Sequence, residues 1–145
     1  MLINLSNHPS KLWSDKQTNA ALELFGNITD IQFPNIPADS NEYIVTSLAK
    51  KYGDKIEELF NKQKHHIKSK GKKYEDAIHL MGEMTFCYAL IDYVDTGDFN
   101  FYASTSDRNV KQLDDGKKIV EFDFVRFRKF SSFFDVLGEV NDSIE

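Results

Sequence analysis

Short, mostly apolar runs alternate along this chain with longer stretches in which apolar residues recur at helical spacing. A run of about five residues has the length of a buried strand, whereas a spacing of three or four residues places side chains on one helix face. The runs are residues 1–6, 28–33 and 77–81, and a helical stretch follows each of them. This alternation predicts an α/β fold with a mostly parallel sheet.

The C-terminal part of the chain has a different pattern. Residues 99–104 are typical of a strand, Asp114-Asp115-Gly116 is typical of a turn, and residues 118–130 are typical of a long final strand. We expect these last two strands to pair antiparallel. The sequence therefore predicts a three-layer α/β domain, with a mostly parallel sheet and a C-terminal antiparallel strand pair.

Length and composition indicate one domain that spans residues 1–145. A chain of 145 residues with 41% hydrophobic content is too short for two independent cores. The single Cys87 cannot form an internal disulfide, no apolar run approaches the roughly 20 residues of a membrane span, and residues 1–10 do not resemble a signal peptide. We expect a cytoplasmic protein that does not contact membranes.

The charge of the chain limits its partners. A formal net charge of −5 argues against binding to long nucleic acid, but it permits a local cationic pocket for a small anion. The lysine-rich residues 62–73 are expected to be a solvated loop of open function. The apolar residues after Phe130, which include Phe133, Phe134 and Leu137, are expected to cover the core or contact a second subunit.

Three loops compete for a ligand site, because loops at the carboxyl ends of parallel strands present free backbone donors. They are residues 7–10, 82–85 and 104–108. In the first loop, Asn7 and Ser10 can donate hydrogen bonds, and His8 is a candidate proton-transfer group because imidazole titrates near neutral pH. A structural role for His8 is equally open, and His79, inside an apolar run, is expected to be a core residue.

The second loop places Gly82 where a ligand can approach the backbone and where the next helix begins. Free amides at a helix start attract phosphate. Glu83 would repel an anion there, so its carboxylate either binds ribose hydroxyls or is a simple first-turn acid. Thr85 has the same two interpretations.

The third loop combines the hydroxyls of Ser104 and Thr105 with the guanidinium of Arg108, a set that suits a phosphodiester. A solvent-exposed turn is the alternative. On the final strand, Arg126 continues the face of Phe122 and Phe124 unless a bulge intervenes, so the strand either runs into solvent or presents an arginine to a ligand or partner. No histidine has an acidic or cysteine partner at ligand spacing, so we expect neither a metal nor a cofactor.

Several segments together resemble a known family. They are LSNHPS near the N-terminus, HLMGEMTFCYALI, ASTSDR and FDFVRFRKF. The chain resembles small single-domain CRISPR-associated proteins of the CARF type. This resemblance implies a Rossmann-like fold, a homodimer, and binding of cyclic oligoadenylate messengers in antiviral defence, which some members cleave as ring nucleases.

The chemistry implied by this resemblance is attack of a ribose 2′-hydroxyl on the adjacent phosphorus without a metal. In that reading Arg108 stabilises the phosphate, Ser10 and Thr105 position it, and His8 transfers the proton. A non-catalytic sensor or sponge for the same messenger, or another nucleotide-metabolising enzyme, would use the same pocket. Whether the protein is an enzyme therefore stays open at the level of the sequence.

Overall fold

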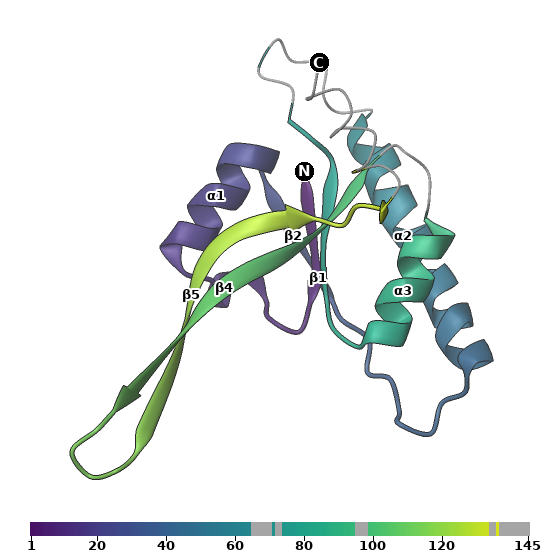
Figure 1. Ribbon diagram of the computed structural model, residues 1–145. Helices are drawn as coiled ribbons and strands as arrows, with labels where there is room; N and C mark the ends of the chain where they lie inside the picture. The colour runs from purple at the N-terminus through teal and green to yellow at the C-terminus, as the bar shows by residue number, and fades with distance from the viewer. Residues whose placement is uncertain (65–70, 72–73, 95–98, 134–135, 137–145) are drawn as a thin grey trace.

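The computed structural model describes residues 1–145 except 65–70, 72–73, 95–98, 134–135 and 137–145 (Figure 1). Its elements follow the alternation seen in the sequence. They are β1 (Leu2–Ser6), a short 3-10 helix η1 (Ser10–Leu12), α1 (Asp15–Phe25), β2 (Ile28–Gln32), α2 (Glu42–Lys64), β3 (Ala77–Met81), α3 (Met84–Tyr93), β4 (Asn100–Gln112) and β5 (Lys118–Lys129). Among the described residues, none of the helices combines the length and apolarity that crossing a membrane requires.

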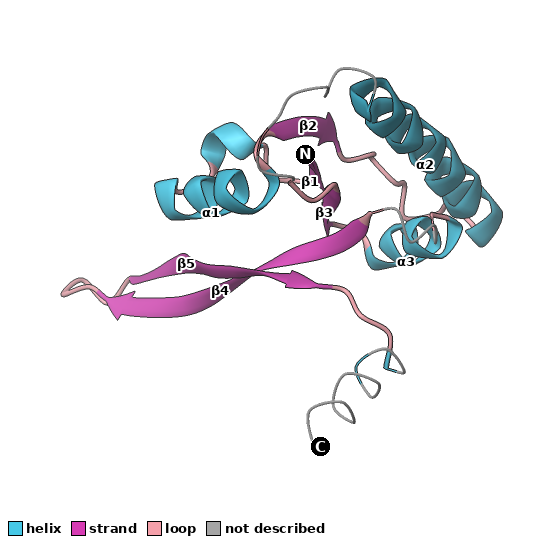
Figure 2. Ribbon diagram, turned by 90° about the horizontal axis from the view of Figure 1, so that it is seen from above, coloured by secondary structure: helices cyan, strands magenta, loops and turns pink. Residues whose placement is uncertain are grey.

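The five strands form one mixed sheet in the order β2-β1-β3-β4-β5. β1 is parallel to both β2 and β3, β3 is parallel to β4, and only β4 and β5 are antiparallel. Figure 2 shows α1 on one face of the sheet, with α2 and α3 on the other. The predicted α/β fold with a mostly parallel sheet and a C-terminal antiparallel pair is therefore confirmed.

The core has two parts because successive side chains of a strand point to opposite faces. On β1, Ile3 and Leu5 face α2 and α3, whereas Leu2 joins the smaller cluster around α1. All five residues of β1 are buried, as expected for a central strand with a helix layer on each side. The smaller cluster is largely aromatic, since Phe124 and Phe127 of β5 close it.

The boundaries of α1 follow from its capping residues. The Ser14 hydroxyl accepts a hydrogen bond from the Gln17 amide at 3.2 Å, which satisfies one of the free amides of the first turn. Gly26 ends the helix with a φ of 82°, a conformation that glycine adopts without strain. The predicted capping pattern and helix stop are both confirmed.

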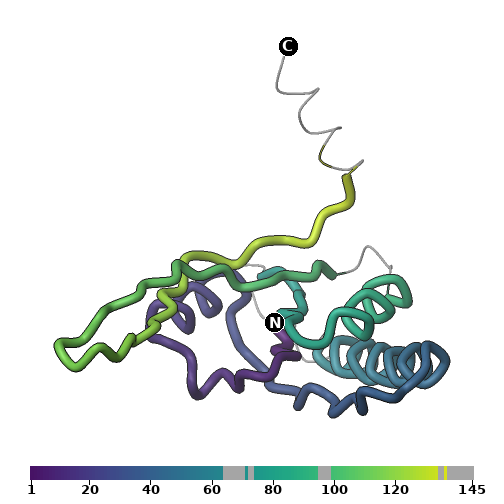
Figure 3. Tube along the Cα trace, turned by 60° about the horizontal axis from the view of Figure 1, so that its bottom comes forward, coloured from purple at the N-terminus to yellow at the C-terminus, as the bar shows by residue number. Residues whose placement is uncertain are grey.

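The expectation of a loop at residues 104–108 is wrong. β4 continues without interruption from Asn100 to Gln112, and β5 pairs with it along its whole length. β3 pairs with β4 only as far as Tyr102, so the later residues of β4 belong to a two-stranded hairpin that projects beyond the sheet (Figures 1 and 3). Polar residues are tolerated in this strand because much of the hairpin faces solvent.

A β-bulge in the hairpin decides where the arginines point. Thr105 is opposite Arg126, but Ser106 is opposite Phe124, so β5 carries one extra residue at this place. The extra residue keeps Phe124 and Phe127 together on the buried face and turns Arg126 away from that face. The bulge thus removes the apparent mixture of phenylalanine and arginine on one strand face.

Two further expectations fall partly outside the described residues. The lysine-rich stretch is not all loop, because α2 extends as far as Lys64. Residues 65–70 and 72–73, together with Phe134 and Leu137 of the tail, lie outside the described residues. Phe133 is exposed, so this residue does not cover the core.

At Gly53, α2 packs closely against the C-terminal end of α3. A Cβ atom at this position would lie 2.6 Å from Cδ1 of Tyr93 and 2.8 Å from Cγ2 of Val94. We expect Gly53→Ala to destabilise the protein by about 1–2 kcal/mol, because overpacking outweighs the gain in helix propensity of up to about 1 kcal/mol. Urea unfolding gives the free energy; the exposed Ser47→Ala in the same helix is the control, and a stabilised Gly53→Ala would contradict this packing.

Candidate functional site

A pocket of about 370 Å³ opens at the carboxyl ends of β1 and β2. Polar residues end these two strands, and the loops that follow them complete the wall, so backbone and side-chain donors face the same space. The lining residues are Asn4, Ser6, Asn7, Pro9, Asp30, Ile31, Gln32 and Phe33. The pocket is large enough for one nucleoside-sized group.

The wall of the pocket belongs to a hydrogen-bonded ladder that crosses four strands. Asn4 of β1 lies beside Asp30 of β2 and beside His79 of β3 in the sheet register. The Asn4 amide nitrogen donates to the Asp30 carboxylate at 2.7 Å, and the Asn4 amide oxygen lies 2.8 Å from Nδ1 of His79. On the far side, Nε2 of His79 lies 3.1 Å from the hydroxyl of Ser104 on β4.

The carboxylate at one end of the ladder fixes the proton positions along it. Because the Asn4 nitrogen must donate to Asp30, the Asn4 oxygen is an acceptor, so His79 carries its proton on Nδ1. Nε2 of His79 is then an acceptor that faces the Ser104 hydroxyl, which also lies 3.0 Å from Sδ of Met81. Burial, and then the charge of nearby His8, lower the pKa of His79 to about 4, so its imidazole is neutral at pH 7. The expectation that His79 is a core residue is confirmed.

Asp30 is the charged group of the pocket. Burial by itself raises the pKa of this carboxyl, but hydrogen bonds from Asn4 and Ser10 and the nearby charge of Lys11 outweigh it and hold the pKa below its ordinary value. Ser10 donates to Asp30 twice, from its amide at 3.0 Å and its hydroxyl at 2.7 Å. The pocket therefore presents a full negative charge, and its lining contains no lysine or arginine.

The loop after β1 is held in place by hydrogen bonds to one backbone carbonyl, that of His8. The carbonyl of His8 accepts from the Asn4 side chain at 3.0 Å, from the Ser6 hydroxyl at 3.0 Å and from the Trp13 indole at 3.2 Å. These bonds leave the His8 side chain exposed, between the pocket-lining residues Asn7 and Pro9. Of the first candidate loop, Asn7 thus lines the pocket and Ser10 bonds to the Asp30 carboxylate of its wall, whereas His8 is not among the lining residues.

In the second candidate loop, residues 82–85, the backbone amides at the start of α3 already have a hydrogen-bond acceptor within the chain. The Glu83 carboxylate caps α3 by accepting from the amides of Thr85 at 3.1 Å and Phe86 at 2.8 Å, and from the Thr85 hydroxyl at 2.7 Å. These hydrogen bonds lower the pKa of the Glu83 carboxyl, and the bond from the Thr85 hydroxyl has the largest effect. The space over Gly82 is filled by the ring of Phe33, whose Cζ would lie 2.1 Å from an added Cβ. The described geometry agrees with the interpretation of Glu83 as a helix-start acid.

The residues of the third candidate loop, Ser104, Thr105 and Arg108, are spread along β4 in the hairpin. Ser104 reaches the ladder through His79, but the Thr105 hydroxyl donates to the carbonyl of Arg126 at 3.2 Å. Arg108 lies six residues beyond the last pairing of β4 with β3 and faces Phe122 across the hairpin. Neither arginine lines the pocket.

Sequence reasoning missed Asn4, Asp30 and Phe33 as pocket residues. One signal was available, since Asn4 stands between two apolar residues of its strand and Asp30 is followed by the apolar Ile31. A buried polar side chain requires a partner, which marks such positions as members of a network. Their mutual contact depends on the register of β1 against β2, which periodicity alone does not provide.

Comparison with known proteins identifies a family without an assigned activity. Residues 1–128 match the model of the family described as Uncharacterized protein MJ1673. The match covers most of the chain, so the chain belongs to that family. No curated protein and no solved structure matches it.

The neutral state of His79 predicts a pH-dependent stability. Between pH 6.5 and about 4, the unfolded chain binds a proton at His79 that the folded protein does not bind. The free energy of unfolding should therefore fall by up to about 3 kcal/mol from this residue as the pH is lowered through that window. The check is urea unfolding at pH 7.5, 5.5 and 4.5, where His79→Gln should lose this part of the decline.

The matched control is His8→Gln, which removes the exposed imidazole and should keep most of the decline. Equal pH profiles for the wild type and His79→Gln would contradict a buried neutral His79. The absolute stability of His79→Gln is expected to be lower at every pH, because the substitution disturbs the ladder.

Proposed function

We propose that this member of the MJ1673 family is a Rossmann-like protein that binds a cyclic oligoadenylate second messenger at the carboxyl ends of β1 and β2. The observation that carries this proposal is the composition of the pocket, with an ionised carboxylate, three amides, one hydroxyl and one aromatic ring. The resemblance of the sequence to small CARF-type proteins supplies the class of messenger. The parallel sheet with helices on both faces is compatible with that resemblance.

The charge of the pocket decides which part of the messenger it takes. An ionised Asp30 repels phosphate but accepts hydrogen bonds from ribose hydroxyls or from the exocyclic amine of adenine. Asn7 and Gln32 offer further polar contacts, and Phe33 offers an aromatic surface. We therefore place one adenosine in each pocket and the linking phosphates outside it, near Lys11.

A cyclic messenger is symmetric, and a symmetric ligand is best held by symmetry-related pockets. Each chain contributes this pocket, so a homodimer would offer two adenosine sites to one ring. This arrangement agrees with the homodimer that the resemblance implies. It also explains how an acidic pocket can bind a polyanion, since the charged part of the ring stays in solvent between the two sites.

Cleavage of the messenger is the second candidate, and the position of His8 favours it. Its imidazole is exposed in the loop between the lining residues Asn7 and Pro9, and it makes no hydrogen bond in the described part of the chain. In the reaction, His8 takes the proton of a ribose 2′-hydroxyl, whose oxygen bonds to the adjacent phosphorus. The bond from phosphorus to the 5′-oxygen breaks, water protonates that oxygen, and a 2′,3′-cyclic phosphate remains.

The first test is binding of cyclic tetra- and hexa-adenylate in EDTA, measured by calorimetry and by thermal shift. We expect the wild type to bind one of the rings and Asp30→Asn to weaken binding at least about tenfold, since each hydrogen bond to a charged group contributes about 1.5–3 kcal/mol. The matched control is Asp39→Asn at an exposed turn outside the pocket. Absence of binding to either ring would overturn the proposal.

The same samples, analysed by chromatography, test cleavage. A linear product with a cyclic phosphate end is expected if the protein is a ring nuclease, and His8→Ala should abolish the product while binding is retained. A wild type that binds the ring and leaves it intact would exclude cleavage and leave a sensor or sponge. Turnover that is unchanged in His8→Ala would rule out the assigned proton transfer.

A further inference from the structure

The β4–β5 hairpin ends in an arm, which we define as residues 106–124. Beyond Tyr102, β4 no longer pairs with β3, although the Ser104 side chain still contacts His79 and Met81, and the arm itself consists of two strands only. From Tyr102 to Gln112 the strand extends about 33 Å at 3.3 Å per residue. Figure 3 shows the arm reaching away from the rest of the chain.

The two faces of the arm differ in character. Directly paired residues share a face, so Arg108 and Phe122 lie together with Val110 and Val120. The opposite face is polar apart from Ile119, with an ion pair of 2.9 Å between Lys111 and Glu121 and a hydrogen bond of 2.6 Å from Asn109 to Asp123. The first face also contains Lys118, and its other members are Ser106, Gln112 and Phe124.

The apolar face of the arm is a continuation of the core. Phe124, at its base, is buried in the aromatic cluster around α1. Phe122, two residues earlier on the same face, is 67% exposed, and Val110 and Val120 beyond it are exposed as well. A two-stranded ribbon with one apolar face is marginally stable until that face is covered.

A second surface, which none of the described residues covers, lies between α2 and α3. Here a groove of about 640 Å³ exposes large apolar side chains, of which Met84 is 81% and Tyr88 is 75% exposed. The lining residues are Ser40, Glu42, Val45, Thr46, Met84, Thr85, Tyr88, Ala89, Asp92 and Tyr93. The groove therefore combines an apolar floor with two carboxylates, and its lining contains no cation.

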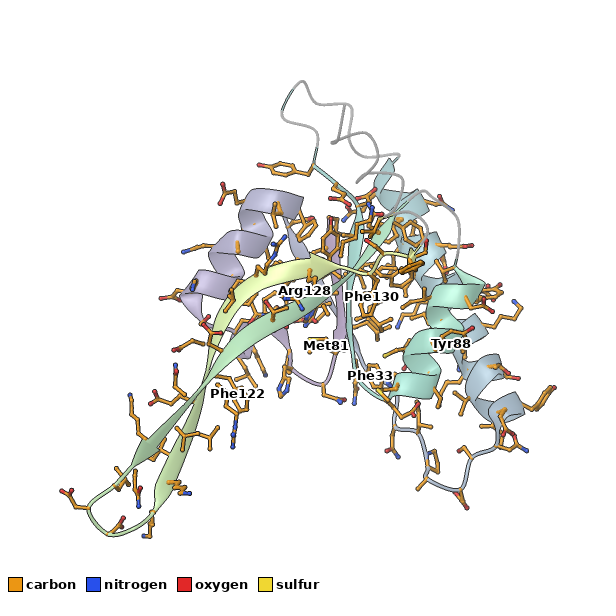
Figure 4. All side chains as sticks on the ribbon, viewed as in Figure 1. Phe33, Met81, Tyr88, Phe122, Arg128 and Phe130 are labelled. Carbon is orange, nitrogen blue, oxygen red and sulfur yellow. The ribbon has the colours of Figure 1, made fainter. Side chains whose placement is uncertain are left out.

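The arm and the groove of one chain lie on opposite sides of the molecule. In Figure 4, Phe122 on the arm and Tyr88 on α3 are on either side of the sheet, and Figure 2 shows the tip of the hairpin and the two helices at opposite ends. The arm of a chain therefore does not reach its own groove. Each surface is available to another molecule.

We propose that the arm of one copy docks into the α2–α3 groove of a second copy, and that the exchange is reciprocal about a two-fold axis. The apolar arm face carries Arg108 and Lys118, whereas the groove carries Glu42 and Asp92, so their charges are complementary. Phe122 is the central anchor and covers the apolar floor.

A second copy is the favoured occupant because one chain carries both complementary surfaces. Reciprocal exchange closes the assembly as a dimer and satisfies both surfaces of both copies at once. The contact lies outside the pocket and involves no pocket-lining residue. It goes beyond the proposed function and is tested with no nucleotide present.

The test is sedimentation equilibrium of the wild type, Arg108→Glu, Asp92→Arg and an equimolar mixture of the two variants. We expect a wild-type dimer, and a rise of at least about tenfold in the dissociation constant for each variant alone. In the mixture, one contact pairs Glu at position 108 with Arg at position 92, and the other contact is the native one. The mixture should therefore regain the wild-type dimer.

The matched control is Asp107→Arg, which reverses a charge on the opposite face of the same arm and should leave the dimer intact. Circular dichroism establishes that each variant is folded. Three outcomes would overturn the proposal: a monomeric wild type, a dimer that both single variants leave unchanged, or a mixture that stays monomeric.

Discussion

The polar ladder from Asp30 through Asn4 and His79 to Ser104 is the interaction on which the rest of the site depends. It occupies a layer of the sheet where strands β2, β1, β3 and β4 would otherwise bury apolar side chains. Each member satisfies its neighbour, and no buried side-chain polar atom in the described part of the chain lacks a partner. Asn4 of the ladder also donates a hydrogen bond to the carbonyl of His8, and Asp30 accepts one from the amide of Ser10. The ladder therefore fixes the course of the loop after β1 and the placement of Ser10.

Much of the fold could be predicted from the sequence because its signals are local. Apolar runs and helical spacing located the strands and helices, and a serine and a glycine gave the ends of α1. The ladder could not be predicted in the same way, because Asn4 and His79 are 75 residues apart and meet only through the strand register. The polar stretch from Ser104 to Arg108 is equally compatible with a loop or with an exposed ribbon, and pairing with β5 decides between them.

The one extra residue in β5 divides this strand into a part that packs in the core and a part that lies on the exposed arm. From Lys118 to Phe124, every second side chain of β5 lies on the same face as Phe122. After the bulge this alternation is shifted by one residue, so that Phe127 returns to the core beside Trp13 and His79. Without the extra residue, the side that now holds Phe127 would present an arginine to the buried imidazole. The same strand therefore belongs to the core at one end and to an exposed surface at the other.

The capping of α3 by Glu83 has a consequence for the selectivity of this edge of the sheet. In many α/β proteins the amides at such a helix start are left open, and a free phosphate can occupy them. Here the chain supplies its own anion to those amides, so the positive end of the helix dipole is neutralised before any solute arrives. The start of α3 is therefore a poor site for inorganic phosphate, and an anion at this edge of the sheet would have to be held by other groups.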